Sequence, residues 1–503
     1  MSRDFGEPEL DRFAGAVARH LGLAFDHSRL AFLGESLEAR LRAVRLPARD
    51  YLSRLETGSA ADLREELREL AAVLTVPETY FFRHPEQIHA FQAGCLDRTG
   101  ARRQLRALSA GCASGEEPYS LAMAVLERWP DAEPPGVSIV GADFNPVMLA
   151  KARAGRYSTW SLRETPDEDQ ARWFRPSGRE LVLDERVRSL VTFEERNLLE
   201  DPRGAWPPGC FDAVFCRNVL MYLRLEKARQ VVANLTRALR PGGLLFLGSA
   251  ETLRNLSQDF HLRHTHGTFY YELAEPAARP RSAGVEPAAV EPQVACLSRA
   301  LDSGVSWIEA IRQASDRVAA LVTDSSRLAA PEPRPPAVEL ALVFQLLREE
   351  RFGEALALLG QLPRESALDP DLLVLRATLL VHAGRRTEAR ELAGQLLAAD
   401  SLNVGAHYVL ALCSEHSGER QAAIEHSRSA IHLDPTFSMA HVHLGILAKR
   451  AEQREIARGE FSRALDLLPR EDASRLLLFG GGFGREALLA FCRAELASCE
   501  VHP

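Results

Sequence analysis

The chain has 503 residues, of which 46% are apolar and 26% are charged. This composition is typical of folded globular protein and excludes a fibrous or wholly disordered chain. Asp and Glu (69) outnumber Lys and Arg (61), so the net charge of −8 excludes the strongly basic balance of many nucleic-acid binders. At about 150 residues per domain, this length predicts roughly three domains.

Targeting signals and cysteine spacing indicate the compartment. The apolar runs are far shorter than the about 20 residues that a membrane-spanning helix needs. The first residues, MSRDFGEPELDRF, are acidic and lack the apolar core of a signal peptide. The eight cysteines include no CxxC pair, which favours reduced thiols over a zinc site or a disulfide framework. These features predict a cytoplasmic protein without a metal site.

The first half of the chain changes from helical to mixed periodicity. Residues 1–95 are expected to form a small all-α domain, because leucines recur at steps of three and four from Leu30 to Leu41. From 96 to 275, short apolar segments alternate with helical ones, which favours an α/β domain with a doubly wound sheet. Strands are expected at 105–109, 137–142, 213–216 and 244–248, with a closing strand at 261–273.

The second half contains a linker and a repeat. Residues 276–336 are rich in Pro and Ala, which predicts a linker, with a loosely patterned helix at 296–322. From 337 to 470, small and apolar residues recur every 34 positions, which resembles four copies of the tetratricopeptide (TPR) repeat and predicts an all-α solenoid. A generic helical bundle is the alternative. Residues 471–503 are expected to form a capping helix. The clearest repeat column is Ala355, Ala389, Ala423 and Ala457.

A glycine-rich loop follows the first expected strand. In SAGCASGEE, Gly111 and Gly115 would let the backbone approach a ligand, but the spacing is neither GxGxxG nor that of a Walker loop. Glu116 and Glu117 would repel a phosphate and suit a cationic or hydroxyl-bearing ligand. Asp143, at the tip of the second strand, could accept both hydroxyls of a ribose or cap the next helix. S-adenosylmethionine fits these charges, because it is a cationic nucleoside without phosphates.

A polar pair, Arg217–Asn218, ends the strand in FDAVFCRNVLMY. Polar groups at the carboxyl ends of strands face the ligand crevice of an open α/β sheet. The next segment, RPGGLLFLGSAE, reads as a turn into another strand. This order resembles class I methyltransferases.

Seven motifs, in this order, resemble the CheR-type chemotaxis-receptor methyltransferases: ETYFFR, LSAGCASGEEPYSLAM, GADFN, ARAGRY, RNLLE, FDAVFCRNVLMYL and RPGGLLFLGSAE. The resemblance covers about residues 10–275. It implies methyl transfer from S-adenosylmethionine to glutamate side chains of a methyl-accepting receptor's cytoplasmic helices, which gives glutamyl methyl esters. The TPR extension resembles the subgroup that carries such repeats, in which they would regulate the enzyme or bind an unknown protein partner.

The resemblance also implies roles for single residues. Arg83 would orient the incoming carboxylate, unless it forms a structural ion pair, and Tyr222 would lie near the methyl group, unless it is a core tyrosine. Receptor docking would use a basic helix, for which a solvated helix face is the alternative. The docking residues would be Arg40, Arg42 and Arg45, and the cofactor-binding residues Thr79, Arg83, Gly111, Glu116, Asp143, Asn197, Leu198, Arg217 and Asn218.

Two departures from the family pattern accompany the resemblance. Pro77 stands where the family often has an asparagine. A β insertion is expected at about 157–196, and its short turn around 176–178 predicts that the protein does not grip a receptor's pentapeptide tether. Two other functions compete: a methyltransferase for RNA or a small molecule, which the acidic balance disfavours, and a non-catalytic S-adenosylmethionine-binding TPR scaffold.

Overall fold

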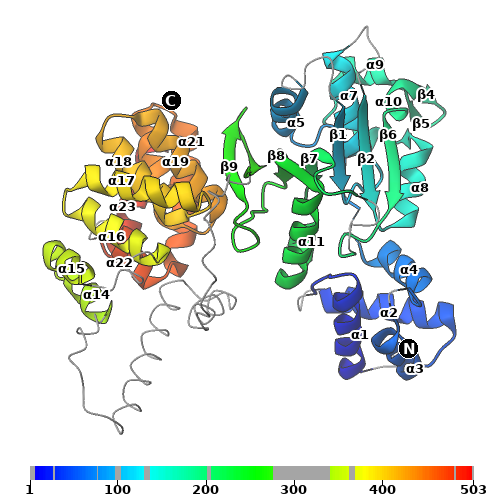
Figure 1. Ribbon diagram of the computed structural model, residues 1–503, viewed down its shortest axis with the longest axis horizontal. Helices are drawn as coiled ribbons and strands as arrows, with labels where there is room; N and C mark the ends of the chain where they lie inside the picture. Colours follow the sequence, from blue (N-terminus) through cyan, green and yellow to red (C-terminus); the bar gives the residue numbers. More distant parts are fainter. Residues whose placement is uncertain are drawn as a thin grey trace, which may run out of the picture. The chain divides into compact units, whose positions relative to one another are not determined.

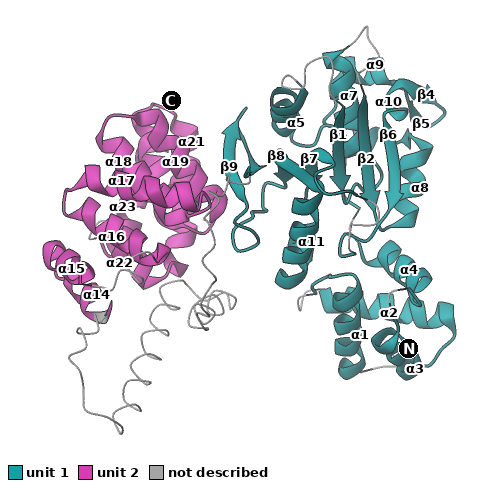
Figure 2. Cartoon of the chain, in the orientation of Figure 1, with its two compact units in different colours: residues 1–278 teal, residues 279–503 magenta. Residues whose placement is uncertain are grey.

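The chain divides into two compact units, residues 1–278 and 279–503 (Figures 1 and 2). The predicted helical and α/β domains both lie in the first unit, and the boundary between them stays a prediction. The predicted linker at 276–336, with its helix at 296–322, lies outside the described residues. The computed structural model describes residues 6–25, 29–59, 61–75, 77–96, 104–129, 136–200, 206–275, 340–361, 369–480 and 483–500.

Four helices at the start of the chain pack around an apolar core of their own. The leucine stripe predicted from the sequence lies on the second helix, where Leu33 and Leu37 are fully buried against Phe13 of the first. Tyr222 and Leu223, from the α/β part, pack against the edge of this core. The helices are α1 (Glu7–His20), α2 (Leu30–Val44), α3 (Ala48–Thr57) and α4 (Arg64–Leu74).

A seven-stranded sheet forms the centre of the first unit, in the order β6-β2-β1-β7-β8-β10-β9 (Figure 1). The first five strands are parallel, and β10 and β9 are antiparallel. This order confirms the predicted doubly wound fold. The strands are β1 (Leu105–Ala110), β2 (Val137–Asp143), β6 (Val191–Glu195), β7 (Phe211–Cys216), β8 (Leu239–Leu247), β9 (Phe260–Thr265) and β10 (Thr268–Leu273).

The single closing strand predicted at 261–273 is a hairpin of two strands. His266 and Gly267 both have positive φ angles (53° and 74°), as in tight two-residue hairpin turns. The alternation of apolar and polar residues continues through the turn, so the pattern could not show that the chain reverses its direction there.

Helices cover the sheet, and aromatic rings fill part of the space beneath them. Phe215 of β7 stacks on Phe246 of β8 with 4.4 Å between ring centroids, and Phe91 and Tyr270 extend this row. The flanking helices include α5 (Pro85–Phe91), η2 (Gln92–Leu96), α7 (Glu116–Arg128), α8 (Pro146–Ala154) and α11 (Leu225–Ala238).

The predicted insertion is a small three-stranded sheet in the order β3-β5-β4. Its predicted end at 196 is too late, because β6 begins at Val191 and pairs with β2 of the main sheet. The turn between β4 and β5 consists of Gly178 and Arg179, as short as expected. The insertion contains β3 (Arg156–Tyr157), η4 (Thr159–Leu162), α9 (Asp167–Trp173), β4 (Phe174–Ser177), β5 (Glu180–Leu183) and α10 (Glu185–Arg188).

Eight helices of the second unit follow the predicted repeat. The second helix of each pair begins at Phe352, Arg386, Arg420 and Arg454, in steps of 34 residues. All four alanines of the repeat column are fully buried. This register confirms the TPR solenoid. The pairs are α14 (Leu340–Arg348) with α15 (Phe352–Leu359), α16 (Pro370–His382) with α17 (Arg386–Ala399), α18 (Val404–His416) with α19 (Arg420–Leu433), and α20 (Ser438–Arg450) with α21 (Arg454–Leu467).

The single capping helix predicted at 471–503 is two helices instead. A short turn, η10 (Leu468–Arg470), leads into α22 (Ala473–Phe479), and α23 (Arg485–Glu500) follows. The sequence Gly-Gly-Gly-Phe-Gly at 480–484 separates them, because glycine disfavours a continuous helix. Only α23 packs on α21 as a cap, whereas α22 packs against α14 and α16. In the part of the chain that the structure describes, no helix is long and apolar enough to cross a bilayer.

The structure does not support the predicted docking role of Arg40. Its guanidinium holds Glu66 of α4 through two contacts of 2.9 and 2.8 Å and reaches Glu69 at 2.9 Å. Tyr51 donates a further hydrogen bond to Glu66, and the Arg40 side chain is only 12% exposed. Its charge therefore joins α2 to α4 inside the helical domain. Arg42 and Arg45 are exposed.

Arg40→Ala is expected to lower the local stability of α2 and α4 by about 3 kcal/mol, because Glu66 would keep a buried charge without its main partner. Hydrogen exchange of the α2 and α4 amides in the full chain measures this free energy. The control is Arg42→Ala on the same helix, which should change it by less than about 0.5 kcal/mol. Equal effects of the two substitutions would contradict a structural role for Arg40.

Candidate active site

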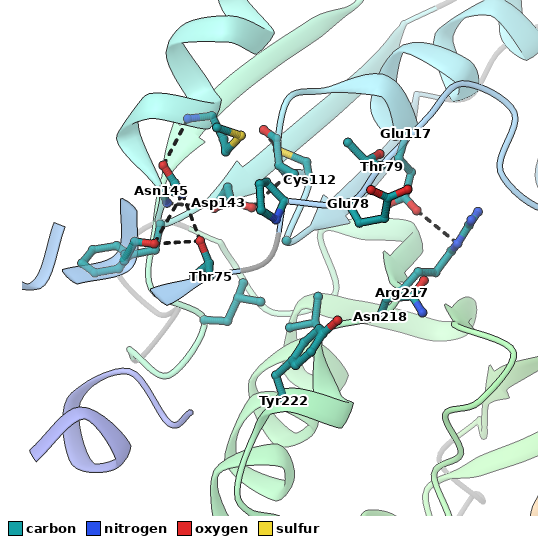
Figure 3. A pocket seen from close by; sticks show the side chains of 18 of the residues that line it. Thr75, Glu78, Thr79, Cys112, Glu117, Asp143, Asn145, Arg217, Asn218 and Tyr222 are labelled. Atoms are coloured by element: carbon teal, nitrogen blue, oxygen red, sulfur yellow. Dashed lines mark hydrogen bonds and ion pairs between the residues drawn. The ribbon is translucent and has the colours of Figure 1, made fainter. Parts of the chain in front are cut away.

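A cavity lies at the carboxyl ends of β1, β2 and β7, where the crevice of a doubly wound sheet is expected (Figure 3). Its wall combines the sheet with parts of the chain far away in sequence. Leu21 and Leu23 follow α1, Leu74 ends α4, and Thr79 precedes α5. The helical domain thus closes one side of the crevice.

The glycine loop after β1 forms one edge of this cavity. Gly111 has a φ of +78°, and its N–H donates to the carbonyl oxygen of Ala142 at 2.7 Å. A Cβ atom at position 111 would lie 2.4 Å from Cγ2 of Val219. Both the backbone conformation and this close approach therefore require glycine, whereas the predicted approach of this backbone to a ligand stays a prediction.

Asp143 lies at the end of β2 and its carboxylate holds the glycine loop. One oxygen accepts the N–H of Ala113 and the other accepts the N–H of Asn145, both at 2.8 Å. Asn145, and not Asp143, caps α8, since its side chain accepts the N–H groups of Val147 and Met148. A carboxylate oxygen can accept more than one hydrogen bond, so Asp143 retains acceptor capacity towards the cavity. Burial raises the pKa of Asp143.

The two carboxylates that start α7 point in different directions, which corrects the prediction for Glu116. Glu116 is 2% exposed, accepts a hydrogen bond from Ser114, and is not among the cavity-lining residues. Glu117 lines the cavity instead. Successive helix residues are rotated by about 100°, so only one of two neighbours can face the ligand. Burial raises the pKa of Glu116.

Glu117 and Arg217 form a buried ion pair on the cavity wall (Figure 3). The Arg217 Nε atom lies 3.3 Å from Glu117 Oε2, and Ser109 donates to the other oxygen at 2.6 Å. Burial lowers the pKa of Arg217, and the Glu117 charge opposes this effect. The pair thus presents a negatively charged carboxylate and a positively charged guanidinium to the cavity. This combination suits a ligand that carries both an ammonium and a carboxylate group.

Glu251, which sequence reasoning missed, organises the loop after β7. Its carboxylate accepts four backbone N–H groups, those of Asn218 (2.7 Å), Gly248 (2.8 Å), Val219 (2.9 Å) and Met221 (3.2 Å). It is 5% exposed. Asn218 has a φ of +57°, a conformation that non-glycine residues rarely adopt without such support. An acid just beyond the last parallel strand, in the segment GSAE, was the available signal.

Asn197 and Leu198 line the cavity next to the helical domain. The Asn197 side chain donates to the carbonyl oxygen of His20 at 3.0 Å and accepts from the N–H of Leu199. Asn234 of α11 donates to the carbonyl oxygen of Leu198 at 2.9 Å. This loop is therefore held from both sides. Asn197 and Leu198 line a part of the cavity where an apolar ring system could pack beside Leu198.

Arg83, Thr79 and Tyr222 complete the cavity wall. Arg83 donates to the carbonyl oxygen of Glu78 at 3.0 Å and lies over the ring of Tyr80. Tyr222 lies on η6 (Leu220–Tyr222), and its ring also packs against the helical core. Pro77, the departure noted in the sequence, lines the cavity without a polar side-chain contact to offer. Among the described residues, no group of three or more His, Cys, Asp or Glu side chains could hold a metal ion.

A family model described as "CheR methyltransferase, SAM binding domain" matches residues 77–269. Chemotaxis protein methyltransferase 2 of Vibrio cholerae is 31% identical over 280 residues, which are 54% of this chain and 96% of that protein. Chemotaxis protein methyltransferase 1 of Pseudomonas aeruginosa is 36% identical over 208 residues, which are 40% of this chain and 75% of that protein. The chain belongs to the CheR methyltransferase family.

Other matches extend this picture. A probable biofilm formation methyltransferase, WspC, of Pseudomonas putida is 34% identical over 245 residues, 48% of this chain, but the match spans only 56% of that protein. The crystal structure of a thermophilic TPR protein of Thermus thermophilus covers 32% of this chain at 20% identity, with a TM-score of 0.25. The TPR assignment rests on the helix register, not on this likeness.

As a CheR-family methyltransferase, the chain binds S-adenosylmethionine, and the cavity fits that molecule. Asp143 offers acceptors for the ribose hydroxyls, and the Glu117–Arg217 pair complements the charged methionine end. Gly111 allows close approach of the backbone. These roles of the individual residues are proposals.

Glu251→Gln is expected to weaken S-adenosylmethionine binding about tenfold, because charge-assisted hydrogen bonds are worth about 1.5–3 kcal/mol each and an amide would turn a donor towards backbone donors. Titration calorimetry measures the dissociation constant. The exposed Glu226→Gln on α11 serves as the control and should leave it unchanged. An unaltered constant in folded Glu251→Gln would contradict the positioning role.

The affinity for S-adenosylmethionine is expected to fall as the pH is lowered. The fall should begin at a higher pH than it would for an ordinary aspartate, whose pKa is about 3.9. The reason is that protonation turns one acceptor oxygen of Asp143 into a hydrogen-bond donor and removes its charge, and burial raises the pKa of Asp143. Asp143→Asn should bind more weakly at neutral pH and lose this acid limb. Dissociation constants measured across a pH series decide the matter. The same acid limb in both proteins would assign the titration to another group.

Proposed function

We propose that this protein transfers a methyl group from S-adenosylmethionine to glutamate γ-carboxylates of a methyl-accepting chemotaxis-type receptor. It would thus act as a protein-glutamate O-methyltransferase in a chemosensory adaptation pathway. Two relatives are named chemotaxis protein methyltransferases, and the family model matches residues 77–269, which include Arg83, Asp143 and Tyr222 of the cavity wall. The observation that carries the proposal is the presence of Arg83 and Tyr222 on the wall that also holds Asp143 and the Glu117–Arg217 pair.

Methyl transfer to a glutamate carboxylate requires little proton transfer by the protein. A glutamate carboxylate has a pKa of about 4.3 in water, so it is already ionised at neutral pH and needs no general base. When bound, S-adenosylmethionine supplies a methyl group on a positively charged sulfur, which a carboxylate oxygen can attack directly. The residues of the cavity therefore act mainly by alignment, which can lower a barrier by several kcal/mol.

Arg83 is the proposed guide for the incoming carboxylate. A guanidinium can hold a carboxylate in a planar two-contact geometry. Arg217 is already engaged with Glu117, and the nearby positive charge of Arg83 contributes to the lowered pKa of Arg217. A carboxylate brought between the two arginines would relieve this repulsion. Tyr222, which also lines the cavity, would contact the region of the transferable methyl group (Figure 3).

The receptor would reach this cavity through its helical cytoplasmic domain. Arg42 and Arg45, both exposed on the helical domain, remain the proposed docking residues after the exclusion of Arg40. Both could attract acidic receptor helices at low ionic strength. The short turn of the insertion at Gly178 and Arg179 supports the proposal that no pentapeptide tether is gripped. The TPR unit would bind a protein partner.

Full-length protein incubated with tritiated S-adenosylmethionine and receptor-containing membranes of the source organism should label a receptor-sized band. Mild base should remove the label, because carboxyl methyl esters hydrolyse readily. Arg83→Ala should reduce the initial rate at saturating S-adenosylmethionine about a hundredfold, as misalignment of a reacting group does. The exposed Arg186→Ala in the insertion is the matched control and should retain the wild-type rate.

Two other outcomes would replace the proposal. Absence of label despite measurable S-adenosylmethionine binding would favour the non-catalytic TPR scaffold. Base-stable label would mean that the acceptor is another group, such as a nitrogen or a thiol.

A further inference from the structure

The short helix α22 lies against the first helices of the TPR repeats (Figure 1). It packs on α14 and α16. Phe479, its last residue, makes edge-on ring contacts with Tyr408 of α18 (5.5 Å) and with Phe437 at the start of α20 (5.2 Å). In stacked helical repeats, helices of equivalent position form one extended, concave surface that binds ligands. The chain therefore covers this surface with its own segment.

Specific polar contacts anchor both ends of α22. At its beginning, the Glu471 carboxylate accepts hydrogen bonds from the N–H and hydroxyl of Ser438, both at 2.8 Å. At its end, Nε2 of His382 lies 2.8 Å from the carbonyl oxygen of Leu478. That carbonyl belongs to the last turn, where helix carbonyls lack partners within the helix. The repeats thus recognise a helix, not only an apolar chain.

An arginine on α22 meets an acidic position of the repeats. Arg475 lies 3.0 Å from Asp434, which follows α19, and 3.3 Å from Glu471, and its guanidinium stacks over the ring of Phe437 at 4.5 Å. Asp434 is 7% exposed. A helix without a basic residue at this position would remove the cation beside this buried carboxylate and leave it only its neutral donors, such as the N–H and hydroxyl of Thr436, which is unfavourable. The surface therefore selects for charge as well as for apolar contact.

The apolar side of α22 is buried as completely as a core helix. Leu476, Leu478 and Phe479 are 5%, 0% and 4% exposed. However, α22 has only seven residues, and isolated helices of this length are not stable in water. Its helical form therefore depends on the surface of the repeats.

We propose that the face formed by α14, α16, α18 and the start of α20 is a docking site for a short helix with leucine and phenylalanine on one side and an arginine near its first turn. In the absence of a partner, α22 occupies this site. A protein partner would displace it with a helix of the same chemistry. This inference rests on the proposed partner-binding role of the TPR unit, but its test requires no methyl transfer.

Displacement has a defined energetic threshold. A segment tethered next to its own site competes at an effective concentration in the millimolar range. A partner helix of the same intrinsic affinity as α22 therefore has to exceed this millimolar concentration to displace it, and a partner binds at lower concentration only if it is intrinsically tighter than α22 or if α22 is weakened. This competition lets the repeats discriminate between partners through Asp434 and the apolar surface together.

A fluorescent peptide with the sequence of residues 470–480 serves as the probe, and the full-length protein is titrated against it. Arg475→Glu places a negative charge beside Asp434 and weakens α22, so the peptide, which keeps its arginine, should bind at least tenfold more tightly than to the wild type. The exposed Arg458→Glu on α21 is the matched control and should behave as the wild type. Equal affinity for Arg475→Glu and wild type would overturn the proposal.

Hydrogen exchange in the wild-type chain provides a second test that depends on no variant. Amides of α22 should exchange much faster than those of α20, because α22 leaves the surface without unfolding of the repeats. Peptide added above the millimolar effective concentration of the tethered segment should increase exchange in α22 and leave α20 unchanged. Common exchange rates for α22 and α20, with no response to the peptide, would identify α22 as a permanent part of the fold and overturn the proposal.

Discussion

Buried carboxylates that accept backbone N–H groups hold the crevice of the sheet in shape. Glu251 collects four such groups and supports the loop that carries Arg217 and Asn218. Asp143 collects two and fixes the glycine loop relative to α8. Loops at the ends of parallel strands have few regular hydrogen bonds of their own, so a charged acceptor that serves several donors replaces them. The positions of the proposed cofactor contacts depend on these two side chains.

The two units use buried charge for different purposes. In the cavity, the Glu117–Arg217 pair lies beside space for a ligand, which is the basis for its proposed contact with the methionine end of S-adenosylmethionine. In the repeats, Asp434 is already paired with Arg475 of α22. The first arrangement prepares a site for a small molecule, whereas the second ties a segment of the chain to a surface.

Much of the fold could be predicted from local patterns. Apolar strands that alternate with helices predicted β1, β2, β7 and β8, and the 34-residue recurrence of buried alanines predicted the repeats. The local pattern could not show that 261–273 turns back on itself, that β6 belongs to the main sheet, or that 471–503 breaks into two helices with different neighbours. Strand pairing and helix packing depend on partners distant in sequence, which periodicity does not report.

The sequence by itself indicated the residue types of the candidate site: glycine at 111 for close approach of the backbone to a ligand, a carboxylate at 143 after a strand, and a polar pair at 217 and 218. These requirements are local, since they arise from backbone conformation and from position in a strand. Only the tertiary structure decided which charges face the ligand. Helix rotation turned Glu117, not Glu116, towards the cavity, and Glu66, 26 residues away in sequence, engaged Arg40. The sequence does not show which way a charged side chain points or which residue it pairs with, because both depend on how the chain packs.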